Sequence, residues 1–455
     1  MLSFARNPQP RTKRFGSHFA LALALVAGGA FGAVALEAPA YAQDDDEEAA
    51  EKDYSEAFIA AYQPLAQRIE AQEDPAALKA ALPALTAAAQ TADDKFVAGQ
   101  TVYSIGARSE DLALQRQGLD MMLDSGKTPA DQYARNLFAA GQLAYQAEDW
   151  TTARARIEQA IAAGYQGGNA LGLAAETYFN EENFAAGLTA LKQAIAAQKQ
   201  AGKPLDESWI RRGFTVAYNN ALADEAAEFA KLYVVNFPSS DVWGDAIAVQ
   251  RSFYDYDDHA LLDLMRLAER TGSMRSERDY FDYISAADAR RLPAEVGRII
   301  AAGLAANMLK TGDVLVTEAA SMAESQAKTA RADLPALEKD ARSSGGTAID
   351  AMAAGDLFLN FEQAAKAEEM YELALTKSGV ETGRALTRLG IAQFDQGKFA
   401  EAKATFDKVD GVRAPIADLW SLYAEAQASG GVTAGPAAVE AETTASVESA
   451  DAPAQ

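Results

Sequence analysis

The sequence predicts an all-α fold built from consecutive helix hairpins. No stretch of useful length alternates apolar and polar residues with the period of two that a half-buried strand requires. Small residues instead recur at a nearly constant spacing: 34 positions separate Gly141 from Ala175, and 35 separate Gly355 from Gly390. Such a spacing indicates that one two-helix unit is repeated, and that neighbouring units stack to bury their apolar faces.

The clearest unit is centred on a turn at Gly397. Gly390 and Ala402 lie twelve residues apart on either side of this turn, and we expect them to face each other where two helices cross. Phe399 and Phe406 should fill the space beside that crossing. The unit resembles the tetratricopeptide repeat (TPR), a helix-turn-helix motif of 34 residues.

Further copies of the pattern strengthen the resemblance. One copy occupies residues 140–161, the next occupies 175–195, and a third occupies 355–375. About four units match the motif closely, and most of the remaining chain matches it loosely. The resemblance implies a right-handed superhelical α-solenoid of TPR-like helix hairpins in two segments. It also implies that the first helix of each unit lines a concave groove that holds a peptide.

The order of the helices follows from their start and stop signals. Asp74-Pro75 ends one helix and begins another, because the residue before a proline avoids the helical region whereas proline suits the first helical turn. Phe237-Pro238 closes the unit that begins at Trp209. In order, the predicted helices and hairpins occupy 53–72, 76–90, 96–105 with 112–123, 129–198, 209–238, 242–253 with 259–270, 280–289 with 294–304, 314–342, 355–406 and 414–428.

The joint between the two segments is predicted where the repeat pattern is interrupted. The stretch 314–342 is long and polar and contains Pro335, so we interpret it as an irregular hairpin. Trp420 and Tyr423 in the final helix should cover the last repeat, because an open solenoid end would expose its core. The predicted organisation is a signal peptide (1–42), an acidic flexible segment (43–52), an N-terminal solenoid (53–312), an irregular helical joint (313–346), C-terminal repeats with a capping helix (347–428) and a disordered tail (429–455).

The N-terminal residues resemble a secretory leader. Basic residues up to Arg14 precede an apolar run at 19–36, and Ala40-Tyr41-Ala42 is an A-x-A cleavage signature. We therefore expect cleavage after Ala42 and a periplasmic protein. An uncleaved membrane anchor that turns the protein into a structural spacer is the alternative, because the run is nearly long enough to span a bilayer. The chain has no cysteine, and a chain of this length can bury a core without disulfides.

The charge of the chain limits its partners. The formal net charge is −24, and removal of a leader with four basic residues and one acidic residue would lower it to −27. Such a charge repels phosphate backbones and anionic headgroups, so neither nucleic acid nor lipid is an expected partner. The acidity is typical of a solvated helical array, and it would also suit a basic partner protein.

The sequence offers little material for catalysis or metal binding. His259 is the only histidine outside the leader, so a zinc site built on histidine or cysteine is excluded. We expect Asp257 or Asp258 to cap the helix that follows, with His259 in its first turn. A calcium loop at this point is the alternative, but it lacks the glycine and the closing glutamate of an EF-hand. No cofactor and no metal are predicted.

The predicted groove places aromatic rings beside amides and charged groups. Rings supply contact area at low entropic cost, and amide side chains can hydrogen-bond a peptide backbone. The alternative for each ring is that it packs against the neighbouring repeat. The combination of Lys, Asn and Arg with which the family clamps two carboxylates is not matched. The predicted groove residues are Arg135, Phe138, Gln142, Tyr145, Asn169, Glu176, Phe179, Asn180, Phe214, Tyr218, Asn360, Arg384 and Phe394.

These observations favour a non-catalytic periplasmic adaptor that binds another envelope protein or peptide, with a basic partner favoured by charge. The alternative is a helical-repeat enzyme or polysaccharide-handling protein of the cell envelope. Such a protein would need a deep acidic pocket with paired carboxylates.

Overall fold

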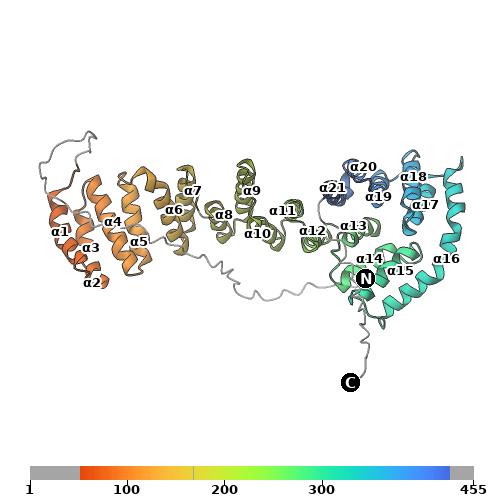
Figure 1. Cartoon of the computed structure of the whole chain (residues 1–455), viewed down its shortest axis with the longest axis horizontal. Helices are drawn as coiled ribbons and strands as arrows, with labels where there is room; N and C mark the ends of the chain where they lie inside the picture. The colour runs from red at the N-terminus through yellow and green to blue at the C-terminus, as the bar shows by residue number, and fades with distance from the viewer. Residues whose placement is uncertain (1–51, 168, 431–455) are drawn as a thin grey trace, which may run out of the picture. The chain divides into compact units, whose positions relative to one another are not determined.

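A computed structural model describes residues 52–167 and 169–430, and this part of the chain contains helices and no strand (Figure 1). The all-α prediction is confirmed. The predicted signal peptide, nearly all of the acidic segment and the tail beyond residue 430 lie outside the described residues. No helix in the described ranges has both the length and the apolar character needed to cross a bilayer.

The chain forms two compact units, one ending at Leu143 and the other beginning at Ala144. The first unit contains α1 (Glu56–Glu70), α2 (Pro75–Lys79), α3 (Leu82–Ala88), α4 (Ala92–Arg108) and α5 (Leu112–Asp124), and α6 (Ala130–Gln146) runs across the boundary. The second unit contains α7 (Trp150–Ala162), α8 (Ala170–Asn180), α9 (Phe184–Gln200), α10 (Glu207–Asn219), α11 (Ala223–Asn236), α12 (Ser240–Phe253), α13 (Asp258–Arg270), α14 (Glu277–Ala287), α15 (Pro293–Ala305), α16 (Val314–Arg342), α17 (Ala348–Asn360), α18 (Ala364–Leu375), α19 (Thr382–Asp395), α20 (Phe399–Phe406), the short 3₁₀ turn η1 (Gly411–Arg413) and α21 (Ala414–Ala428).

Glycines allow α4 and α5 of the first unit to touch backbone to backbone. A Cβ atom added to Gly118 would lie 2.4 Å from the backbone nitrogen of Tyr103, and one added to Gly99 would lie 2.7 Å from the carbonyl oxygen of Gly118. Neither neighbour can move away, because both are main-chain atoms of a packed helix. The close approach explains why the repeat pattern is hard to recognise here: the helices meet through glycines on both sides.

Three hairpins of the second unit share one packing rule. A glycine on the first helix lies against an aromatic ring sixteen residues later on the second helix, so that a Cβ atom added at the glycine would come within 2.6 Å of that ring. The pairs are Gly213 with Phe229, Gly355 with Tyr371, and Gly390 with Phe406. A larger residue would overpack the crossing and force the helices apart. The predicted close approach at Gly390 is confirmed, but the atoms nearest to it belong to Phe406 rather than to Ala402, the residue predicted to face it.

The turns of the hairpins repeat as regularly as their cores. Glu148 and Glu182 lie 34 residues apart, and both adopt a φ of +58° in the turn between paired helices. Glu362 and Gly397 occupy the corresponding turns of the C-terminal hairpins, with φ values of +60° and +76°. A side chain at positive φ carries a steric penalty, so the surrounding hairpin must hold these glutamates in place.

The segment expected to be an irregular hairpin is instead one long helix. α16 has 29 residues and contains Pro335. A proline removes one helical hydrogen bond, which would favour a break. Buried residues on both sides of the proline, Val316, Ala323 and Leu334 before it and Ala341 after it, anchor the helix so that it continues through the proline. Val316 and Ala323 are seven residues apart, as are Leu334 and Ala341, which keeps each pair on one face.

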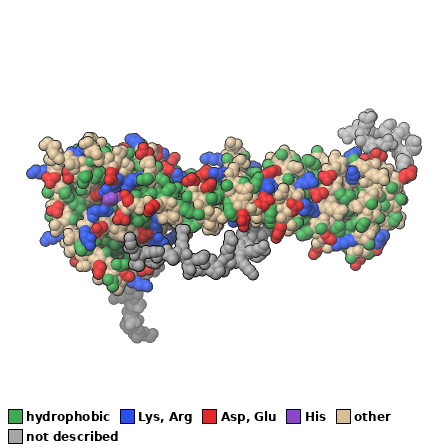
Figure 2. All heavy atoms as spheres, turned by 180° about the vertical axis from the view of Figure 1, so that it is seen from behind, with side chains coloured by type: hydrophobic (Ala, Val, Ile, Leu, Met, Phe, Trp, Pro, Cys, Tyr) green, Lys and Arg blue, Asp and Glu red, His purple; other side chains and the backbone are tan. Residues whose placement is uncertain are grey.

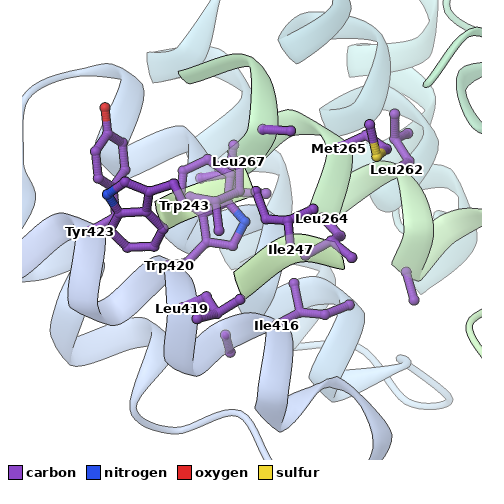
Figure 3. Close-up of a cluster of buried hydrophobic side chains, with 14 of the residues drawn as sticks. Trp243, Ile247, Leu262, Leu264, Met265, Leu267, Ile416, Leu419, Trp420 and Tyr423 are labelled. Carbon is purple, nitrogen blue, oxygen red and sulfur yellow. The ribbon is translucent and has the colours of Figure 1, made fainter. Parts of the chain in front are cut away.

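The C-terminal half of the second unit packs back onto α11, α12 and α13 (Figure 1). Trp420 of α21 stacks on Phe406 with 5.6 Å between ring centroids, which confirms the predicted cap over the last repeat. The same helix also reaches α12, because the rings of Tyr423 and Trp243 meet edge to face at 5.3 Å. Figure 3 shows the resulting apolar cluster, in which side chains of α12, α13 and α21 interleave. The final helix therefore closes the part of the second unit from α11 to α21 into a ring of helices.

Candidate functional site

Some of the predicted groove residues lie on the surface and bridge neighbouring hairpins. The Asn180 side-chain nitrogen donates to the Tyr145 hydroxyl at 3.0 Å. Arg212 donates hydrogen bonds to both carboxylate oxygens of Glu176, at 2.7 and 2.8 Å. The Tyr218 hydroxyl lies 3.0 Å from the Ser252 Oγ. The partners are 34 to 36 residues apart in each case, so each contact joins equivalent positions of successive units. We call this row, which comprises Tyr145, Glu176, Asn180, Arg212, Tyr218 and Ser252, the first-helix face.

Three predicted groove residues are buried and cannot meet a ligand. Phe138 is 6% exposed and Phe179 is 5% exposed, so the alternative of packing within the array holds for both rings. The Arg212 guanidinium covers the Phe179 ring at 5.2 Å from its centroid. Asn360 has no exposed surface, and its Oδ1 accepts from the backbone N–H of Glu295 at 2.8 Å. Its side chain satisfies the start of α15 rather than a peptide.

The remaining predicted residues have varied surroundings. Asn169 caps α8 and also accepts from the Trp209 indole N–H at 2.7 Å. Phe214 stacks on Tyr218, whereas Phe394 is packed between Phe399, Trp420 and Tyr423. In the first unit, Arg135 is exposed and Gln142 is partly exposed. Arg384 lies apart from the first-helix face, beside a set of buried charges that the sequence did not predict.

These charges form the centre of the second unit, and we call them the central charge cluster: Asp263, Arg266, Glu295, Asp356, Arg388 and Arg413. Asp263 of α13 has no exposed surface and accepts from Arg388 at 3.1 Å and from Arg413 at 2.7 Å. The indole N–H of Trp420 donates to the Asp263 carbonyl at 2.9 Å. These partners lie 125 to 157 residues along the chain, so the cluster joins the two ends of the ring.

Each carboxylate of the cluster is held in its charged form by arginine. Burial alone would raise the pKa of Glu295, but Arg266 donates to both of its oxygens at 2.7 Å and the pKa falls to about 2. Burial would also raise the pKa of Asp356, but the positive charges of Arg388 and Arg384 outweigh this effect. The pKa of Asp356 is therefore also lowered to about 2. The pKa of Asp263 is lowered by the same balance. A buried charge is tolerated only when paired in this way.

His259 lies at the edge of the cluster on the cation-rich side. Asp257 caps α13 by accepting from the backbone N–H of Ala260 at 2.7 Å, which confirms the predicted cap and leaves His259 in the first turn. The Nδ1 of His259 lies 3.2 Å from an Arg291 nitrogen and 3.5 Å from an Arg388 nitrogen. Arginine can only donate, so this ring nitrogen is the acceptor and carries no proton. Burial, followed by the charges of Arg384, Arg388 and Arg291, lowers the pKa of His259 to about 4.

The stability of the protein should fall as the pH drops through the range in which only the unfolded chain binds a proton at His259. The pKa of the folded group, about 4, is below the ordinary value of 6.5, so stability is present above pH 6.5 and is lost as the pH falls towards 4. The cluster carboxylates titrate only below their ordinary values of 3.8 and 4.5. Urea unfolding at pH 7.5 and 4.5 should therefore show a larger loss for wild type than for His259→Gln. An equal loss in both proteins would contradict the assigned surroundings of His259.

The visible surface carries both signs of charge. On the face that Figure 2 shows, acidic and basic side chains are interspersed rather than gathered into a patch of one sign. The arginines of the central charge cluster, by contrast, lie inside the second unit.

Comparison with known proteins gives structural matches only. No family model matches the chain, and no curated protein sequence matches it. Among solved structures, the TPR2AB domain of yeast Sti1 in a pHSP90 complex is 12% identical, with a TM-score of 0.23, and the match covers 66% of this chain and 96% of that chain. A tetratricopeptide repeat protein from Parabacteroides merdae is 11% identical, with a TM-score of 0.24 and coverages of 64% and 98%. Cut9-Hcn1 from the APC/C is 13% identical, with a TM-score of 0.23 and coverages of 73% and 67%.

The predicted series of repeated helix hairpins is confirmed by the spacing of the helices. α17 and α19 begin 34 residues apart, as do α7 and α9, and consecutive helices in these hairpins pack against each other. The chain is an all-helical repeat protein whose solved structural neighbours include tetratricopeptide repeat proteins.

Proposed function

We propose that this protein is a non-catalytic interaction scaffold of the periplasm, and that its first-helix face binds an extended segment of a basic partner protein. The observation that carries the proposal is the row of contacts on α6, α8, α10 and α12, which recurs once per repeat. Tyr145, Asn180 and Tyr218 keep part of their surface open to solvent along this row. An extended peptide could follow a surface of this kind from one unit to the next.

The charge near this row favours a basic segment. Glu148 and Glu182 are exposed at the turns beside Tyr145 and Asn180, whereas Glu181 is already paired with Arg154 at 2.7 Å. The whole chain carries −24, so a basic partner would be attracted over distance as well as on contact. The periplasmic part of the proposal rests on the leader-like residues up to Ala42, and the mass of the mature N-terminus tests it.

The non-catalytic part of the proposal rests on how His259 is held. A general base needs a neighbour that orients it and stabilises its protonated form, usually a carboxylate. The Nδ1 of His259 faces two guanidinium groups instead, which oppose protonation. Glycan hydrolysis would instead need a carboxylic acid with a raised pKa, whereas the pKa values of Glu295 and Asp356 are lowered to about 2. Incubation with peptidoglycan or other envelope glycans should therefore give no turnover.

Crosslinking in the native envelope tests the scaffold. Wild-type protein should trap a stoichiometric partner, and Tyr145→Ala combined with Asn180→Ala should reduce its recovery at least tenfold. Both side chains are part of the face, and neither belongs to the core, so the variant should keep its fold. Circular dichroism and thermal melting would verify this.

A matched control changes the other side of the same repeat. Thr189 and Gln193 are exposed on the second helix α9, and replacing both with alanine should leave recovery unchanged. Equal recovery with all three proteins would remove the first-helix face from the proposal. Loss with the α9 variant alone would assign binding to the second helices.

A further inference from the structure

A cavity of about 460 Å³ opens between the long helix α16, the helix α17 and the start of α19. Its volume falls within the range of small-molecule sites. The middle of α16 forms one wall of the cavity through residues between Gln326 and Leu337. The cavity belongs to the second unit and is formed by elements other than those of the first-helix face.

One wall of the cavity is apolar. Leu337 of α16 faces Ala348, Met352 and Leu357 of α17, and Val380 lies in the connection before α19. Ile349 lines the same cavity and is 77% exposed, which is unusual for a large aliphatic side chain. An apolar body placed here would remove this surface from water.

The opposite end of the cavity carries arginines with unused hydrogen-bonding capacity. Arg291 donates to the Ala286 carbonyl at 2.8 Å and contacts His259, but its buried Nε has no partner. Arg384 donates to Asp356 at 3.1 Å, and its buried Nε also has no partner. A buried donor without a partner costs free energy, so two such donors on one cavity need an explanation.

The charges around this end do not balance. Among the described residues, Arg291 makes no ion pair, because no carboxylate lies within 4.0 Å of it. The buried carboxylate at this end, Asp356, is already shared by Arg384 and Arg388, which leaves Arg291 without a paired carboxylate. Arg290, Asp333 and Glu381 also line the cavity, and Glu381 approaches Arg384 at 3.6 Å, but it is largely exposed to water and compensates little.

We propose that this cavity binds the carboxylate of an apolar organic acid, with the carboxylate at Arg291 and Arg384 and the apolar body along α17. A carboxylate accepts hydrogen bonds from guanidinium groups in matching planar geometry. Its single charge suits the local excess better than a dianion would, because Asp333 and Glu381 also line the cavity and repel higher negative charge. The same chemistry occurs in a free medium-chain acid and in the C-terminal residue of a peptide.

Calorimetric titration of the full chain distinguishes these sources. The probes are octanoate, 1-octanol as its uncharged counterpart, and acetyl-Gly-Gly-Leu as free acid and as amide. We expect octanoate to bind at least tenfold more tightly than octanol. Binding of the peptide acid but not its amide would extend the site to chain ends, and binding of octanoate alone would restrict it to free acids.

Variants assign the binding to this cavity. Arg291→Met and Arg384→Met should each weaken octanoate at least tenfold. Arg291→Met removes an uncompensated cation, so its melting temperature should not fall. Ala353→Trp should block the cavity without changing its charge, because Ala353 lines it and is exposed. Arg298 provides the matched control: its Nε is also buried without a hydrogen-bond partner, but it lies outside the cavity and forms ion pairs with Glu269 and Glu362.

Three results would overturn the proposal. The first is no binding of octanoate or of the peptide acid at millimolar concentration. The second is equal affinity for octanoate and octanol, which would show that the arginines take no part. The third is equal weakening by Arg298→Met and Arg291→Met, which would place the effect outside the cavity.

Discussion

Replacing Asp263 with asparagine should lower the stability of the second unit by about 3–5 kcal/mol, the cost of removing one partner from a buried ion pair. The substitution keeps the shape of the side chain and removes its charge. Arg413 then loses its one buried carboxylate, and Arg388 keeps only Asp356. Hydrogen exchange of the full chain, followed by mass spectrometry, should show faster opening of α13, α19 and α21 together.

Asp395→Asn is the control for this experiment. Asp395 also pairs with an arginine, Arg270, through two contacts of 2.7 Å, but its side chain is 23% exposed. Water can solvate the arginine that remains when a partly exposed ion pair is broken. The expected loss of stability is therefore about 1 kcal/mol or less. If both variants opened to the same degree, burial of the central charge cluster would not be what makes Asp263 important.

Trp420→Ala should cost a similar amount, about 3–5 kcal/mol, because it removes a fully buried aromatic side chain and leaves a cavity. Its indole also donates to the Asp263 carbonyl, which would be left without that hydrogen bond. Hydrogen exchange distinguishes two roles for this residue. If Trp420 only caps the last repeat, its replacement should reduce the protection of amide hydrogens in α19 and α20 alone. If it closes the ring, amide hydrogens in α12 and α13 should lose protection as well. We expect the second pattern.

Tyr423→Phe measures the hydrogen bond without the packing. The Tyr423 hydroxyl donates to the Arg270 carbonyl at 2.7 Å, so its removal should cost about 1 kcal/mol and leave the ring closed. Loss of protection in α12 after this small change would mean that closure depends on the hydrogen bond rather than on the apolar cluster.

The sequence predicted the local structure because local structure depends on residues close together in the chain. The hairpin at Gly397, the cap at Asp257 and the final helix from Ala414 to Ala428 all agree with the structure. Turn chemistry, capping and the spacing of small residues act over fewer than forty positions. The prediction of an irregular hairpin at 314–342 was wrong for a related reason. Pro335 is a strong local signal for a break, and the packing that overrides it involves residues distant in the chain.

The candidate sites were harder to predict because they join distant residues. Asp263 lies between two leucines in an amphipathic helix, and nothing nearby indicates Arg388 or Arg413 as its partners. One signal was available: Arg384 and Arg388 are one turn apart on a helix whose neighbours Ala385 and Leu389 belong to the core. A cation at a core position requires a buried partner. Which carboxylate supplies it depends on how the chain folds back, and helical periodicity does not contain that information.

The closure of the second unit also determines when it can become native during synthesis. Asp263 precedes Arg413 by 150 residues, and at about 5–20 residues per second the ribosome needs roughly 8–30 s to supply that partner. Hairpins that stack only on their neighbours can fold as they emerge, but α12 and α13 must wait with apolar surface exposed and with Asp263 paired only to Arg266 of its own helix. During that interval the nascent chain is exposed to aggregation. A premature stop before Ala414 would therefore prevent α12 and α13 from packing, although both helices are translated long before that point.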